Sequence, residues 1–75
     1  MKLPASLAGN AKIEIFDMAA ELVRTIDNVA LTSGTHNYVE WDGTNDHGAK
    51  VASGVYIARV KVGSEVRFHK MAVIK

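Results

Sequence analysis

The sequence predicts a small all-β domain built as an antiparallel β-sandwich. Six glycines separate short segments rich in β-branched and aromatic residues, the pattern of a β domain with frequent turns. Two of these segments alternate apolar and polar side chains with a period of two, as half-buried strands do. A length of 75 residues with 48% hydrophobic content indicates one folded domain over residues 1–75 and excludes a disordered chain.

Residues 1–10 form an N-terminal lead-in, and the two clearest strands follow at 11–16 and 55–62. One face of each strand is apolar, whereas the opposite face carries charged side chains, so we expect the apolar faces to form the core. These faces consist of Ala11, Ile13 and Ile15 in the first strand and of Tyr56, Ala58, Val60 and Val62 in the second.

Two further strands are predicted. Gly63 and Ser64 suit a two-residue type II′ turn, which would join residues 55–62 to a strand over 66–74 in a hairpin. Val39 and Trp41 share one face of the segment before Asp42, which we interpret as a fourth strand.

Residues 17–26 fit two structures. Asp17 could cap a helix in which Met18, Leu22 and Ile26 repeat at four-residue spacing, and local propensity slightly favours this alternative. The other alternative is a turn over residues 18–20 followed by a strand over 22–26. Tertiary packing can override a difference in propensity of this size.

Composition narrows the classes of function. Nine basic against eight acidic residues give a net charge of +1, without the basic excess expected of a nucleic-acid-binding protein. No apolar run is long enough for membrane insertion, and residues 1–10 lack the features of a signal peptide. The absence of cysteine removes disulfides and thiolate ligands, and the three histidines show no paired metal-binding spacing, so we expect no cofactor.

The segment 42–48 is rich in side-chain oxygens. Asp42, Asn45 and Asp46 could ligate calcium, although no glutamate stands at the twelfth position that an EF-hand requires. Turn chemistry is the favoured interpretation, because Asp and Asn side chains accept hydrogen bonds from nearby backbone amides. We therefore expect no metal site.

No catalytic residues are predicted. A serine, histidine and aspartate could be combined into a triad, but the sequence contains no nucleophile-elbow pattern. A domain of this size also has little room for both a core and a substrate pocket. The sequence therefore predicts a protein that is not an enzyme.

The aromatic residues suggest two kinds of surface. Tyr38 and Trp41 with the 42–48 loop could stack on sugar rings, but the inward-facing pattern of Trp41 and Tyr56 favours core packing. Phe16 and Phe68 fall outside the predicted core, and exposed apolar residues gathered on one face would mark a docking surface.

Four stretches together resemble a known family. They are KIEIFDMAAELVRTI at 12–26, EWDGTNDHG at 40–48, VASGVYIARV at 51–60 and HKMAVIK at 69–75. They are similar to the immunoglobulin-like domain of the flagellar hook-capping protein family and to type IX secretion C-terminal sorting domains. The resemblance implies an immunoglobulin-like or fibronectin-III-like sandwich, and a strand rather than a helix over 22–26. It implies structural roles for Trp41, Asp42, Gly43, Gly48, Gly54 and Tyr56.

The resemblance also implies a non-catalytic interaction or sorting module, outside the cell or at its surface. Ala20 stands where the family usually has glycine, so its turn must avoid positive φ or become strained. The family's first strand would be only partial here, which predicts an open edge that recruits strands from a protein partner or a second copy. We expect this docking edge at Ala11, Ile13 and Phe16, with Phe68 nearby. A subunit of an extracellular polymer, completed by strand donation, is the alternative.

Overall fold

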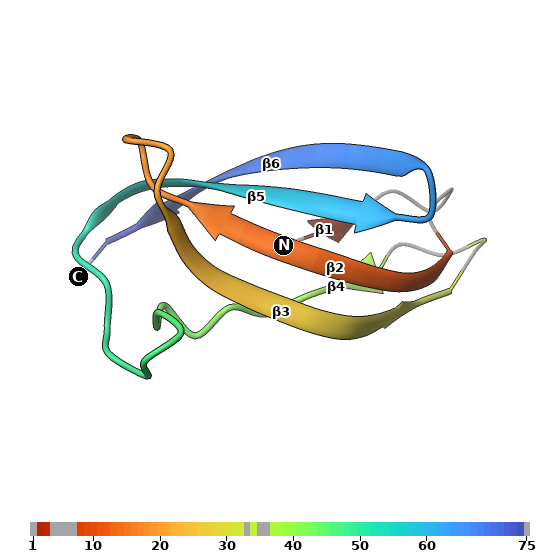
Figure 1. The fold of residues 1–75 in the computed structure, drawn as a ribbon, viewed down its shortest axis with the longest axis horizontal. Coiled ribbons are helices and arrows are strands. Elements are labelled where there is room, and N and C mark those ends of the chain that lie inside the picture. The colour runs from red at the N-terminus through yellow and green to blue at the C-terminus, as the bar shows by residue number, and fades with distance from the viewer. Residues whose placement is uncertain (1, 4–7, 33, 35–36, 75) are drawn as a thin grey trace.

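In the computed structural model, which describes residues 2–3, 8–32, 34 and 37–74, the chain is all-β (Figure 1). No helix occurs among the described residues, so none there could cross a membrane. The strands are β1 (Lys2–Leu3), β2 (Gly9–Phe16), β3 (Leu22–Leu31), β4 (Asn37–Tyr38), β5 (Gly54–Val62) and β6 (Glu65–Val73). The predicted fold class is confirmed.

The strands form two sheets. One has four strands in the order β3-β2-β5-β6, and the other pairs β1 with β4. Every pairing is antiparallel. The larger sheet has the neighbour relations of the C′-C-F-G sheet of an immunoglobulin fold, and β1 and β4 lie behind it in Figure 1.

The core lies between one face of the four-stranded sheet and the segment that follows β4. Ile13, Ile15 and Ala58 are fully buried on this inner face, as the alternation in the sequence predicts. The following segment covers them with Val39 and Val51, each 9% exposed. The sandwich therefore has one regular layer and one layer made largely of loop.

Residues 17–31 form a turn and a strand, so the helical alternative is wrong. The Asp17 carboxylate accepts hydrogen bonds from the amides of Ala19 and Glu21 at 2.9 and 3.0 Å, which closes a tight turn. The chain then enters β3, which pairs with β2. Asp17 thus caps a turn rather than a helix, and the pairing with β2 outweighs the local helical preference.

Two other expectations have different outcomes. The hairpin is confirmed, because Val62 pairs with Glu65 across Gly63 and Ser64, and Gly63 takes a φ of 57°. The strand expected before Asp42 is present only in part, since β4 (Asn37–Tyr38) ends before Val39 and Trp41. Trp41 donates its indole N–H to the carbonyl of Thr44, which itself pairs with Lys50 in an isolated antiparallel bridge.

The expected docking edge at residues 11–16 is also wrong. β2 is an interior strand that pairs with β3 on one side and β5 on the other. Ala11 and Ile13 are 2% and 0% exposed, so neither side chain can reach a partner. The true edges of the sheet are β3 and β6.

Ala20 provides a test of strain in the 17–21 turn. Its φ is 62°, a left-handed conformation that costs an L-residue about 1–2 kcal/mol. We expect Ala20→Gly to raise the free energy of unfolding by about 0.5–1 kcal/mol after the extra chain entropy of glycine is counted. Urea unfolding would measure the change. Ala19→Gly is the control and should leave stability unchanged or lower; a less stable Ala20→Gly protein would contradict this account.

Candidate interaction surfaces

The loop after β4 is held by its own polar side chains. Asp42 accepts hydrogen bonds from both the amide and the hydroxyl of Thr44, at 3.1 and 2.5 Å. Asn45 accepts from the amides of His47 and Ala49, at 2.9 and 3.0 Å. The Thr44 hydroxyl, then its amide, and the charge of Arg24 hold the pKa of Asp42 below its ordinary value.

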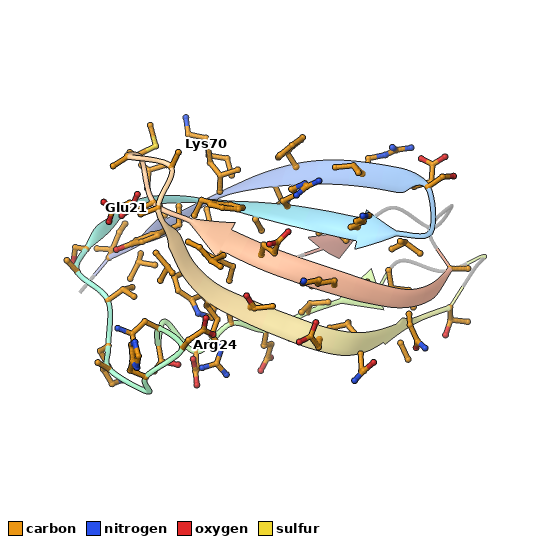
Figure 2. All side chains as sticks on the ribbon, in the orientation of Figure 1. Glu21, Arg24 and Lys70 are labelled. Atoms are coloured by element: carbon orange, nitrogen blue, oxygen red, sulfur yellow. The ribbon has the colours of Figure 1, made fainter. Side chains whose placement is uncertain are left out.

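The same loop covers one end of β3. Asp46 accepts a hydrogen bond from the amide of Thr25 at 2.9 Å and donates its own amide to the carbonyl of Val23 at 3.0 Å. Arg24 reaches from β3 into the loop, where it donates to the Asn45 carbonyl at 2.9 Å (Figure 2). Through these hydrogen bonds the loop covers the edge of β3 at Val23 to Thr25.

The calcium candidates therefore act as structural groups. Asp42, Asn45 and Asp46 each accept hydrogen bonds from backbone amides, as the turn interpretation predicts. Among the described residues, no group of three or more histidine or acidic side chains gathers around a common point.

Trp41 and Tyr56 pack edge to face, with ring centroids 5.3 Å apart. The Tyr56 hydroxyl donates to the carbonyl of Ala52, four residues upstream, at 2.7 Å. This hydrogen bond has the form of the tyrosine corner found in immunoglobulin-like domains. Both aromatic residues thus join the loop layer to the sheet.

Trp41 is only half-buried, and its remaining surface lines a cleft of about 520 Å³. Arg24, Ile26, Glu40 and Asp42 complete the lining. This cleft is where a sugar ring could meet Trp41. The Tyr38 side chain and His36 lie outside the described residues, and the indole N–H is already used within the loop.

Gly43 and Gly48 sit in this loop with φ of 75° and 81°, which explains the glycines there. Gly54 differs from the expectation, because its φ is not in the left-handed region and an added methyl group would make only ordinary contact with Tyr56. Nothing in the structure explains a need for glycine at position 54.

The two edges of the four-stranded sheet differ. The β3 edge is interrupted by two register shifts against β2 and by Asn28 with a φ of 56°, and the loop clamps its first residues. β6 pairs with β5 without interruption over nine residues, and no other described strand lies along its free side. Bulges and coverage protect an edge from foreign strands, so β6 is the accessible edge.

The face of the sheet that points away from the core carries an apolar groove of about 350 Å³. Phe16, Ile57 and Phe68 from three adjacent strands meet there beside Met18. Phe68 is 69% exposed and Met18 68% exposed. We call this groove, lined by Phe16, Asp17, Met18, Ala20, Ile57, Arg59 and Phe68, the outer groove.

The structure thus brings Phe16 and Phe68 together, as expected, but adds residues that sequence reasoning missed. Ile57 and Met18 were not among the candidates. The signal for Ile57 was available, since it is an apolar residue on the otherwise charged face of residues 55–62. The position of Met18 does not follow from the sequence, because residues 17–26 fit both a helix and a turn followed by a strand.

These features define an immunoglobulin-like domain with an open strand edge and an apolar outer face. The chain belongs to the FlgD Ig-like domain family, whose family model matches residues 1–65. This is a structural, non-enzymatic domain family. The match supports the hook-capping resemblance but not the sorting-domain one. The chain matches no curated protein and no solved structure.

The Asp42–Thr44 contact predicts a pH dependence. Because the pKa of Asp42 is lowered on folding, its contribution to stability is full above the ordinary aspartate pKa of about 4 and is lost as pH falls below it. We expect Thr44→Val to be less stable than the wild type at pH 6 in urea unfolding, with a smaller difference at pH 2.5. Thr25→Val is the matched control. A Thr44→Val difference that is the same at both pH values would contradict the assignment.

Proposed function

We propose that the chain is a non-catalytic interaction module of a secreted or surface-assembled bacterial protein, joined to protein partners by strand pairing and apolar contact. Membership of the FlgD Ig-like domain family supports a structural role in an assembly. The observation that carries the proposal is the free β6 edge, nine uninterrupted residues beside the exposed ring of Phe68. Its backbone groups could extend the sheet by adding a strand from a partner.

The partner strand could come from a second copy, as in a polymer subunit that exchanges strands, or from another protein. A polysaccharide partner at the Trp41 cleft is less well supported, because the indole N–H is engaged with Thr44 and the ring packs against Tyr56. A location outside the cell or at its surface is part of the proposal, and only the family relation supports it.

The first test is the solution mass by light scattering from about 1 µM to 1 mM, with amide hydrogen exchange at both limits. For a self-pairing edge we expect the mass to rise with concentration and the β6 amides to become protected, because new strand hydrogen bonds form along that edge. Phe68→Lys should raise the dissociation constant about tenfold by placing a charge beside the edge.

Leu22→Lys is the matched control, since Leu22 is 50% exposed on the protected edge strand β3. It should leave association unchanged. A monomer at every concentration would exclude pairing between copies, and concentration-dependent protection confined to β3 would contradict the assignment of the edge. A shift of the Trp41 fluorescence on adding polysaccharide would instead favour the carbohydrate alternative.

A further inference from the structure

The outer face of the sheet carries an unbalanced pair of lysines. Lys12 of β2 lies directly opposite Lys61 of β5, and both are exposed. Like charges at directly opposed positions destabilise a sheet. Neither lysine forms an ion pair within the described part of the chain, and the neighbouring Glu14 is bound to Arg59 at 3.2 Å. Asp27 lies in the β3 bulge beside Lys12 but forms no ion pair with it among the described residues, so the positive charge at this end of the face is only partly offset.

The outer groove lies at the other end of the same face. Ile57 in the groove and Lys61 are four residues apart on β5, and both point away from the core. Four residues of an extended strand span about 13 Å. Lys70 adds a further exposed positive charge opposite Ile57, near the groove (Figure 2). The face thus presents an apolar depression and a basic site at a fixed separation.

We propose that the outer face binds an acidic protein segment, with a bulky apolar side chain in the outer groove and a carboxylate between Lys12 and Lys61. The proposal rests on the function proposed above and specifies the chemistry of the partner. An extended segment meets both sites when its acidic residue lies four positions from its apolar residue, because side chains an even number apart share one face. The carboxylate would relieve the repulsion between the two lysines.

Two other occupants fit less well. If a second copy bound face to face, Lys12 and Lys61 would meet either the same two lysines of that copy or its apolar groove. The first arrangement would repel, and the second would bury charge against apolar side chains. An anionic membrane would bring negative charge over the whole face, the Asp17 side of the groove included, whereas the proposed segment carries its carboxylate only at the lysine pair. Charge complementarity therefore favours an acidic protein segment.

The experiment is a selection of displayed random twelve-residue peptides on the wild-type protein, on Lys12→Glu and on Lys50→Glu. Lys50 is an exposed loop residue on the far side of the core segment and serves as the control. On the wild type we expect enrichment of Asp or Glu four residues from a bulky apolar residue. A synthetic peptide of the enriched sequence should shift the amide signals of Phe16, Ile57, Lys61 and Phe68.

Lys12→Glu should lower the affinity for that peptide about tenfold, whereas Lys50→Glu should change it less than twofold. Lys12→Glu should keep the circular dichroism spectrum and the cooperative melting of the wild type, since Lys12 is exposed and the substitution exchanges repulsion from Lys61 for repulsion from Asp27. This second readout shows that the variant is folded when binding is lost. The affinity of the wild type should fall as sodium chloride rises from 50 to 500 mM.

The proposal is overturned if no sequence is enriched, if the enriched peptides are neutral or basic, or if Lys12→Glu binds them as the wild type does. Binding to phosphatidylserine vesicles but not to the peptides would replace it with a lipid surface, and a dimer lost in Lys12→Glu would replace it with a second copy. This outcome can be told apart from a failure of the proposed β6 pairing. The pairing is tested by the solution mass and by hydrogen exchange of the β6 amides, and neither measurement uses a Lys12 variant.

Discussion

The burial of β2 against β5 is the interaction on which the rest of the structure depends. Ile13 and Ile15 face Val60 and Ala58 across the strand pair, and these four side chains are at most 1% exposed. Apolar burial of this kind supplies most of the driving force for folding in a domain too small for a large core. Because β2 and β5 occupy the middle, β3 and β6 become the edges, and every available backbone edge of the larger sheet lies on one of these two strands.

One edge of the four-stranded sheet is covered by a loop, and the other is open among the described residues. The loop after β4 binds β3 through Asp46 and through the Arg24 side chain, and Asn28 further distorts that strand. β6 remains regular and carries Phe68 at its outer face. The Asp and Asn side chains of this loop thus hold its turn and fasten it to β3. Of the two edges, only β6 is left open by the described residues, and this is the edge at which association is proposed.

The outer face of the sheet also carries features that lower the stability of the isolated domain. The like charges of Lys12 and Lys61 and the exposed side chains of Phe68 and Met18 are local features that do not stabilise an isolated domain. Places where a sequence departs from local rules are expected at functional sites rather than at random. In the proposed function, the immunoglobulin-like scaffold of the FlgD family supports one edge and one face for binding.

The sequence by itself determined the fold class, the inner faces of β2 and β5, the hairpin at Gly63 and the structural use of the 42–48 loop, because each depends on local periodicity or turn chemistry. It placed Phe16 and Phe68 outside the core for the same reason. Local propensity left residues 22–26 open between helix and strand, and only the family resemblance favoured the strand. Tertiary structure alone decided that this strand extends to Leu31, that the strand before Asp42 ends at Tyr38, and that the free edge is β6 rather than β2. Strand order depends on pairings between residues far apart in the chain, and a period of two reports which face is buried but not which neighbours a strand has.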